Sequence, residues 1–140
     1  MPFTTTHVVR FQHCDAAQIV FYPRYYEMLN ATIEEWFETR LAWSFAAIHV
    51  TMGMGVPTVA QEARYLRPSR LGDRLDFTLT PLRLGGSSVT LSVEVSCEGE
   101  ARASFTSTLV WFAQADGRPR RWPDELRSAI EKEMQEGRAR

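Results

Sequence analysis

Apolar residues in the first third of the chain recur at steps of three and four. From position 23 onward, the members of this stripe are Tyr26, Leu29, Ile33, Trp36 or Phe37, and Leu41. Such spacing is typical of an α-helix with one buried face. Pro23 favours a helix start, because proline has no backbone N–H and its φ suits the first turn. The pattern therefore predicts a long helix from about Pro23 to Arg40, with Tyr22 at or near its N-cap.

The middle of the chain alternates apolar and polar residues with a period of two, which is the pattern of half-buried strands. It predicts extended segments at 58–66, 75–80, 89–96 and 101–113, and the residues before the helix predict a short strand at 7–11. Turns at 85–87 and 97–100 join antiparallel neighbours. Apolar residues lie on both faces towards the end of 101–113, which indicates a strand at the sheet centre or at a subunit contact.

A second, shorter helix is predicted directly after Trp122. Proline and acidic residues favour the first turn of a helix, and an apolar stripe follows them: Pro123, Asp124, Glu125, then Leu126, Ile130 and Met134. Residues 137–140 are expected to form a frayed tail. One strand, a long helix, four strands and a short helix make an α+β order, in which only the long helix can cover the apolar face of the sheet.

Length and composition narrow the possible functions. The 140 residues, 44% of them hydrophobic, suit one domain spanning 1–140. A formal net charge of -1 gives no field that would attract nucleic acid. Without an apolar run of about 20 residues or a signal-peptide pattern, we expect a cytoplasmic protein that does not bind membranes. Cys14 and Cys97 lack the spacing of a zinc site or a disulfide framework, so no metal is expected.

Asp15 is the main candidate for chemistry, because it stands in a turn just before the long helix. The first turn of a helix offers unpaired N–H groups and the positive end of the dipole, which can hold a developing oxyanion. A carboxylate a few residues upstream can act on the same carbonyl. The alternative is that Asp15 only accepts backbone hydrogen bonds in an Asx turn, the commoner role of an Asp in a loop.

The segment from Asp15 to Tyr25 resembles the hotdog-fold thioesterases, and within them the 4-hydroxybenzoyl-CoA thioesterase type. The shared features are an Asp followed by a small-residue turn, an Ile-Val-aromatic-aromatic-Pro run at 19–23 and the aromatic Tyr25. Gln18 departs from the pattern, since the family usually has Gly there, which adopts φ > 0 more readily. In element order the resemblance covers nearly the whole chain and implies a hotdog fold, a long central helix wrapped by an antiparallel sheet.

This resemblance implies that the substrate is an acyl-CoA, either aromatic, such as 4-hydroxybenzoyl-CoA, or of short to medium chain length. CoA is part of the substrate, and no cofactor is implied. Asp15 acts as the nucleophile or as the general base that activates water, and the sequence leaves both roles open. Backbone N–H groups near Tyr22 and Arg24 are expected to supply the oxyanion hole, while Phe21 and Tyr25 are expected to line the acyl slot.

CoA also carries phosphates, which arginine binds through paired hydrogen bonds. Arg83 lies beside the Gly85-Gly86 turn, where Gly86 and Ser87 offer backbone N–H groups. The resemblance places this hairpin near the nucleotide, so these residues are predicted to bind substrate. Taken alone, they are an ordinary hairpin turn with a surface charge.

A long final strand leaves exposed edges in a monomer, so we expect a homodimer or homotetramer, with Trp111 and Phe112 marking the contact. The rival function is a non-catalytic acyl-CoA-binding or assembly module on the same fold, since a fold alone does not establish activity. Asp15 separates the two possibilities, because a binding module needs no ionised group beside a thioester carbonyl.

Overall fold

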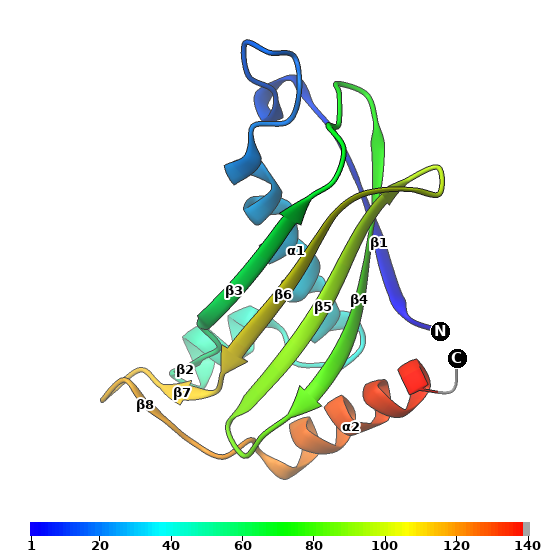
Figure 1. Ribbon diagram of the computed structural model, residues 1–140. Coiled ribbons are helices and arrows are strands. Elements are labelled where there is room, and N and C mark those ends of the chain that lie inside the picture. Colours follow the sequence, from blue (N-terminus) through cyan, green and yellow to red (C-terminus); the bar gives the residue numbers. More distant parts are fainter. Residues whose placement is uncertain (139–140) are drawn as a thin grey trace.

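The computed structural model describes residues 1–138 as one antiparallel sheet that curves around a long helix (Figure 1). Its twelve elements, in chain order, are β1 (Phe3–Val8), η1 (Phe11–His13), α1 (Tyr22–Thr39), η2 (Ala47–Thr51), β2 (Met54–Gly55), β3 (Thr58–Tyr65), β4 (Arg74–Leu84), β5 (Ser88–Cys97), β6 (Glu100–Val110), β7 (Phe112–Ala113), β8 (Arg118–Pro119) and α2 (Asp124–Arg138).

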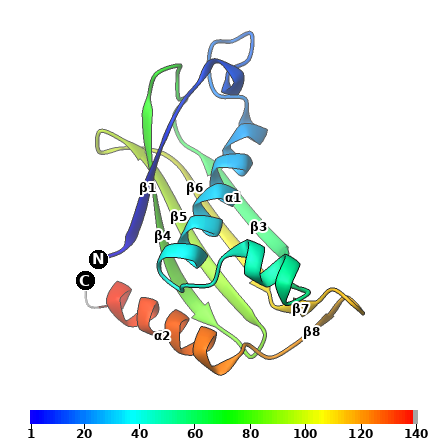
Figure 2. The same cartoon turned by 180° about the vertical axis from the view of Figure 1, so that it is seen from behind.

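Helix α1 lies across the inner face of the sheet (Figure 2), as the apolar stripe predicts. It begins one residue before the predicted start, so the N-cap is Phe21 and not Tyr22. The stripe is also wider than predicted, because three turns each bury two neighbouring residues. Its buried members are Tyr25, Met28, Leu29, Thr32, Ile33, Trp36 and Phe37. Tyr26 is only half-buried.

The main sheet has the strand order β1-β4-β5-β6-β3, with every neighbouring pair antiparallel. Two predicted turns are confirmed, since 85–87 joins β4 to β5 and 98–99 joins β5 to β6. Inward residues of these strands are almost fully buried while their neighbours are partly exposed, as period-two alternation requires.

Two strand predictions at the ends of the sheet are wrong. The first strand covers 3–8, not 7–11, because residues 11–13 form the turn η1. The last strand ends at Val110, and Phe112 and Ala113 pair with β2 and β8 in a small second sheet. The break occurs at Trp111, which is buried against Trp43 and Trp122 and therefore leaves the ladder.

The exposed edge is also not where the sequence predicts it. Strand β6 lies between β5 and β3, so the edges of the main sheet are β1 and β3. Every side chain of β3 is exposed except Ala63, which is partly exposed. Trp111, predicted to mark a subunit contact, belongs instead to the core of the single chain. Phe112 is only half-buried.

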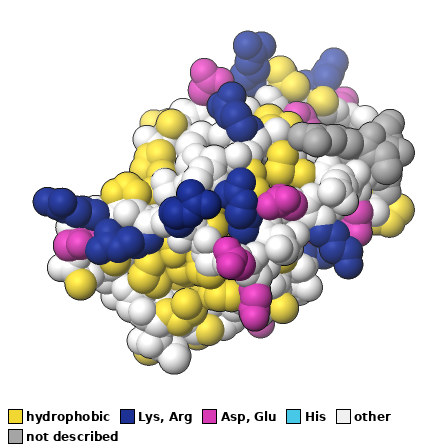
Figure 3. Space-filling view, turned by 90° about the horizontal axis from the view of Figure 1, so that it is seen from below, with side chains coloured by type: hydrophobic (Ala, Val, Ile, Leu, Met, Phe, Trp, Pro, Cys, Tyr) yellow, Lys and Arg dark blue, Asp and Glu magenta, His cyan; other side chains and the backbone are white. Residues whose placement is uncertain are grey.

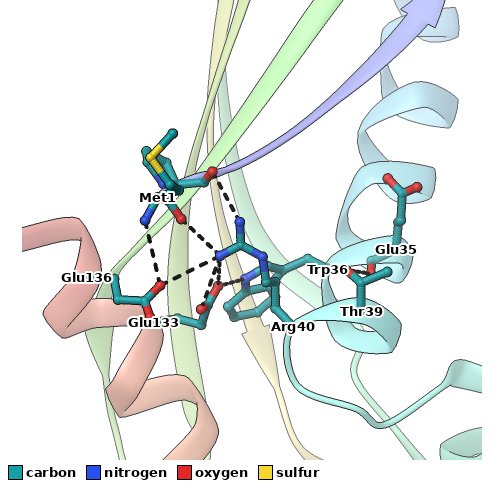
Figure 4. A network of polar contacts seen from close by, with 8 residues as sticks. Met1, Glu35, Trp36, Thr39, Arg40, Glu133 and Glu136 are labelled. Carbon is teal, nitrogen blue, oxygen red and sulfur yellow. Dashed lines mark hydrogen bonds and ion pairs between the residues drawn. The ribbon is translucent and has the colours of Figure 1, made fainter.

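Helix α2 packs against β4, and its far end is tied to α1 by a polar cluster (Figure 4). Glu133 accepts hydrogen bonds from the indole Nε1 of Trp36, at 2.9 Å, and from Arg40 Nη1, at 3.3 Å. Arg40 also donates to the carbonyl oxygens of Met1 and Pro2. The cluster therefore joins both ends of the chain to the end of α1.

The predicted second helix is confirmed, with Leu126 and Ile130 fully buried. Its backbone continues through Arg138, so the predicted frayed tail at 137–140 is wrong for its first two residues, and residues 139–140 lie outside the described part. Within residues 1–138, no helix combines the length and the apolar character that crossing a membrane requires.

Candidate active site

Asp15 lies in a tight hairpin whose second strand leads directly into α1. Three backbone contacts define it: Phe21 N–H donates to His13 C=O (2.8 Å), Cys14 pairs with Val20, and Asp15 N–H donates to Ile19 C=O (3.0 Å). The tip closes with Gln18 N–H on Asp15 C=O at 2.9 Å. Since each strand of the hairpin is paired, Asp15 is held at the same end of the molecule as the first turn of α1.

The hairpin tip requires a left-handed backbone at Gln18, whose φ is 66°. Glycine adopts this conformation without steric cost, whereas a residue with a Cβ does not. The position at which the sequence departs from the family pattern is therefore one where the backbone favours glycine. The turn forms with Gln18 in place, so the departure leaves the geometry of the hairpin intact.

The carboxylate of Asp15 has a structural contact and an available oxygen. Its Oδ1 accepts the N–H of Ala17 at 2.8 Å, which is the Asx turn of the alternative interpretation. Among residues 1–138 its Oδ2 has no partner, and the side chain is exposed. The two interpretations are therefore compatible, because one oxygen supports the turn while the other faces solvent.

The start of α1 provides one unpaired donor. Arg24 N–H is engaged, since it donates to the carbonyl oxygen of Phe21 at 2.8 Å, and Pro23 has no N–H. In the described part of the chain, the N–H of Tyr22 has no acceptor. Tyr22 is thus the residue whose backbone can donate to a carbonyl oxygen placed at the helix start.

A cavity of about 610 Å³, which we call the tyrosine cavity, opens beside this donor. Its walls come from the hairpin, the start of α1, the end of β3 and the loop that follows it: Ile19, Val20, Tyr22, Tyr25, Tyr65, Leu66, Arg67, Pro68 and Ser69. The ring of Tyr65 contacts those of Tyr22 and Tyr25, with centroids 6.1 and 5.8 Å apart. The walls are mostly aromatic and aliphatic, so the cavity suits an apolar, ring-sized group.

A second cavity of about 650 Å³ lies on the Asp15 side of the hairpin. Asp15, Cys14 and Phe11 line it together with Arg70 and Leu71 from the loop between β3 and β4. The structure therefore brings Asp15, Tyr22 and Tyr25 to one end of the fold, but it distributes them over two neighbouring cavities. Phe21 is exposed and contacts the ring of Tyr22 without lining either cavity.

The remaining predicted binding residues lie elsewhere in the single chain. Arg83, Gly86 and Ser87 belong to the β4–β5 hairpin at the opposite end of the sheet (Figures 1 and 2). Strand β4 advances nine residues from Arg74 to Arg83, which is about 30 Å at roughly 3.3 Å per residue. Within one chain, the structure does not bring these residues to the site of Asp15.

Figure 3 shows this opposite end from below, where Lys and Arg side chains are interspersed with acidic ones around an exposed hydrophobic area. Arg83 lines a separate cavity of about 360 Å³ between β4 and α2, together with Arg127 and Glu131. Arg127 donates to the carbonyl oxygen of Gly85 and pairs with Glu131, so it supports the hairpin turn. These contacts describe a structural junction between β4 and α2.

A polar network, which was not predicted, stands behind the tyrosine cavity. The phenol of Tyr25 donates to Ser69 Oγ at 2.9 Å, and Arg102 Nη1 donates to the same oxygen at 3.2 Å. Arg102 also pairs with Asp73 at 2.8 Å and Glu100 at 2.7 Å. Hydrogen bonds from Arg70 N–H and from Arg102 hold the pKa of Asp73 below its ordinary value, so this carboxylate stays ionised.

The pKa values of side chains around the tyrosine cavity are also shifted. Burial raises the pKa of Tyr25, and desolvation together with the hydrogen bond to Tyr26 raises the pKa of Tyr65. A phenol is already protonated at neutral pH, and these shifts move both groups further from ionisation. His13 accepts the N–H of Arg10 on its Nδ1 at 2.7 Å, and burial lowers its pKa, which favours a neutral ring.

Ser69, Tyr65 and Arg102 had no local signal in the sequence. They lie 44, 40 and 77 residues after Tyr25 and meet it only because the loop after β3 folds against the hairpin. Val20 N–H donates to Ser69 C=O at 2.8 Å, which fixes this contact. Within residues 1–138, no group of three His, Cys, Asp or Glu side chains is placed to hold a metal ion.

Comparison with known proteins identifies the family of this chain. The sequence model of the thioesterase-like superfamily matches residues 9–130. A 1,4-dihydroxy-2-naphthoyl-CoA hydrolase of Nostoc punctiforme is 25% identical over 126 residues, which cover 90% of this chain and 84% of that protein.

Solved structures show the same fold. A 1,4-dihydroxy-2-naphthoyl-CoA thioesterase from Synechocystis has a TM-score of 0.84 at 21% identity, covering 93% of this chain and 96% of that one. A hypothetical protein from Staphylococcus aureus in complex with CoA has a TM-score of 0.90 at 16% identity, covering 96% of this chain and 85% of that one. The fold is the hotdog fold that the sequence predicts.

Proposed function

The chain belongs to the thioesterase-like superfamily, and on this basis we propose that it hydrolyses an aromatic acyl-CoA thioester to the free acid and CoA. One observation carries the proposal: the unpaired N–H of Tyr22 lies beside an aromatic-lined cavity, at the end of the fold that also holds the carboxylate of Asp15. The relatives named above as acting on 1,4-dihydroxy-2-naphthoyl-CoA support a thioester with an aromatic acyl group.

The acyl group occupies the tyrosine cavity in this proposal. Its volume of about 610 Å³ admits a one- or two-ring acid, and the rings of Tyr22, Tyr25 and Tyr65 offer edges and faces for stacking. The thioester carbonyl then lies at the start of α1, where Tyr22 N–H donates to its oxygen. A well-placed donor of this kind contributes about 3 kcal/mol to the stability of the oxyanion.

Asp15 performs the chemical step in one of two ways. As the nucleophile, its carboxylate attacks the carbonyl carbon, the C–S bond breaks, CoA leaves as the thiolate, and water then hydrolyses the mixed anhydride. As the general base, it removes a proton from water while that water attacks the same carbon. Both routes use the oxygen that is not engaged by Ala17 N–H.

For the phosphates of CoA, the geometry favours arginines other than Arg83. Arg67 lines the tyrosine cavity and Arg70 lines the Asp15 cavity, whereas Arg83 lies at the opposite end of the sheet. We therefore expect Arg67→Glu or Arg70→Glu to raise KM with little change in kcat, because uniform binding is lost. Arg83→Glu is the matched charge reversal, and from a position remote from both cavities it should leave KM unchanged.

We also propose a homodimer formed through β3. This strand is a nearly fully exposed edge with unpaired backbone groups, including Val59, whose side chain is 60% exposed. A lysine on an edge strand hinders pairing, so Val59→Lys should shift the protein towards monomer in analytical ultracentrifugation. Val50→Lys, on the exposed turn η2, is the matched control. A dimer that persists in Val59→Lys would contradict the proposed interface.

The activity is tested with purified protein and a panel of CoA thioesters that includes benzoyl, hydroxybenzoyl, naphthoyl, butyryl and palmitoyl groups. Release of free thiol is followed with a chromogenic thiol reagent, and CoA binding is measured by calorimetry. The proposal expects turnover that is highest with an aromatic acyl group. Binding of CoA without release of thiol from any thioester would support the non-catalytic module instead.

A further inference from the structure

The loop between β3 and β4, residues 66–73, contributes to the walls of both cavities at the start of α1. Residues 66–69 line the tyrosine cavity, and residues 70–71 line the Asp15 cavity. A shift of this loop would therefore change the shape of both cavities at once. What holds the loop in place bears directly on the site.

Ser69 connects this loop to the chain on either side of Tyr22. Its carbonyl oxygen accepts the N–H of Val20 at 2.8 Å, and its Oγ accepts the phenol O–H of Tyr25 at 2.9 Å. Val20 belongs to the hairpin of Asp15, and Tyr25 belongs to the first turns of α1. Ser69 therefore holds the hairpin and the helix start against one point of the loop, with the Tyr22 N–H between them.

Arg102, on β6, is anchored where this loop begins. Its carbonyl oxygen accepts the N–H groups of Leu66 and Arg67, at 2.8 and 3.2 Å. Its Nε donates to Glu100, on the same strand, at 2.7 Å. The side chain is only 13% exposed, and a buried charge requires partners of this kind. The backbone and the guanidinium of Arg102 are both fixed by these contacts.

The Nη1 group of Arg102 holds the middle and the end of the loop. It has two protons for three acceptors. The shortest contact is with Asp73 Oδ2, at 2.8 Å, while the Pro68 carbonyl oxygen and Ser69 Oγ are both 3.2 Å away and share the second proton. Asp73 Oδ2 also accepts the N–H of Arg70 at 2.9 Å. One guanidinium therefore clamps the loop beside Ser69 and again at its last residue.

We propose that Arg102 is a positioning residue for the hydrolysis, which aligns Asp15 with the N–H of Tyr22 through the 66–73 loop. The inference rests on the proposed function, because it concerns the same reaction. Arg102 lines neither of the two cavities, so it acts through the loop and not on the substrate. Without its guanidinium, the two hydrogen bonds of Ser69 lose their fixed support. A small misplacement of reacting groups is costly, because the rate depends steeply on their geometry.

Arg102→Met is the main test, since methionine keeps an unbranched apolar side chain and has no donor. Thiol release is measured with the best acyl-CoA, and calorimetry with CoA gives its Kd and the fraction of protein competent to bind. We expect kcat per competent site to fall between about tenfold and a hundredfold. The Kd for CoA should change by less than about threefold, because long, exposed side chains such as that of Arg67 can follow a small shift of the loop.

Arg40→Met is the matched control. Arg40 is also a partly buried arginine, whose Nη1 pairs with the carboxylate of Glu133 and donates to the carbonyl oxygen of Met1. It is the C-cap of α1, at the other end of the helix from the site. Arg40→Met should lower Tm, while kcat per competent site stays within about twofold of the wild type. A merely structural role of Arg102 predicts this same result for Arg102→Met.

Two further measurements examine the clamp directly. Asp73→Asn removes the charge that pairs with Arg102 but keeps the size of the side chain, so it also serves where Arg102→Met folds poorly. It should lower kcat per competent site by about threefold or more. Amide hydrogen exchange at Val20, whose N–H donates to Ser69 C=O, should become about tenfold faster in both variants and remain unchanged in Arg40→Met.

The outcomes separate this inference from the proposed function. If the wild type hydrolyses a thioester but Arg102→Met and Asp73→Asn both keep kcat per competent site within about twofold, the positioning role is overturned and the thioesterase function stands. The same holds if Arg40→Met lowers kcat as much as Arg102→Met, or if the Kd for CoA weakens as much as kcat falls. If the wild type releases no thiol from any thioester, the proposed function fails first, and a role of Arg102 in hydrolysis fails with it.

Discussion

Replacing Asp15 by Asn tests the chemical role of this carboxylate without disturbing its structural one. The side chain of Asn is nearly isosteric, and its Oδ1 can still accept the N–H of Ala17 that Asp15 accepts at 2.8 Å. The Asx turn is therefore preserved. Because the side chain is exposed, the free energy of unfolding should change by less than about 0.5 kcal/mol, and Tm by less than about 2 °C.

Turnover should respond very differently. An amide oxygen is a poor nucleophile and a poor base, so Asp15→Asn should lower kcat on the best acyl-CoA by at least about a hundredfold. This corresponds to about 2.7 kcal/mol of transition-state stabilisation. KM should change little, since the carboxylate makes no contact that the amide oxygen cannot reproduce in the ground state. The assay is initial-rate thiol release at saturating substrate, with Tm measured on the same preparations.

Asp116 offers a matched control in the same chain. Its Oδ1 also accepts a backbone N–H two residues further on, that of Arg118 at 3.0 Å, and it too is exposed. Asp116 lines neither of the two cavities at the start of α1. Asp116→Asn should leave kcat unchanged. If Asp15→Asn keeps kcat within a few-fold of the wild type, the carboxylate has only the structural role and the proposed mechanism is refuted.

Three further predictions concern stability and protonation. Glu133→Ala should destabilise the protein by about 2 kcal/mol, because the buried indole N–H of Trp36 loses its acceptor. Glu133→Gln retains an acceptor and should be less destabilising in thermal unfolding. Equal destabilisation by the two substitutions would contradict this account. Gln18→Gly should raise the free energy of unfolding by up to about 1 kcal/mol, and with it Tm, since it removes the left-handed strain at φ 66°. An unchanged or lower Tm would refute this. Burial lowers the pKa of His7, so its NMR titration midpoint should lie below 6.5. Between pH 6.5 and the pKa of the folded protein, the unfolded chain binds more protons than the folded one, so the free energy of unfolding should decline as the pH falls through this window. A midpoint at or above 6.5 would be inconsistent with this.

Prediction from the sequence was most accurate where the determining interactions are local. The start of α1 was placed within one residue, because Pro23 and the apolar spacing report directly on the first turns of a helix. The need for a positive φ near Gln18 was also visible, since the family pattern has glycine there. Asp15, Tyr22 and Tyr25 lie within eleven residues of one another, and their placement at one end of α1 follows from that proximity.

Predictions that depended on strand order failed. The apolar residues at 109–112 are equally compatible with a central strand that continues and with a strand that ends in a buried tryptophan. Only the packing of Trp111 against Trp43 and Trp122 decides between them. Likewise, the exposed edge was assigned to the last strand, whereas the sheet places β6 inside and leaves β3 at the edge. The neighbours of a strand are set by long-range pairing, which its own sequence does not encode.

The sequence by itself determined the helical and strand periodicities, the turns between strands and the contiguous motif around Asp15. Backbone conformation and amphipathic spacing are properties of neighbouring residues, which is why they can be read locally. The tertiary structure alone decided that Ser69 and Arg102 contact each other beside Tyr25, and that Arg83 lies at the far end of β4, about 30 Å from Arg74 at its start. The reason is physical: a hydrogen bond across 44 residues, such as that between Tyr25 and Ser69, forms only when the core has folded.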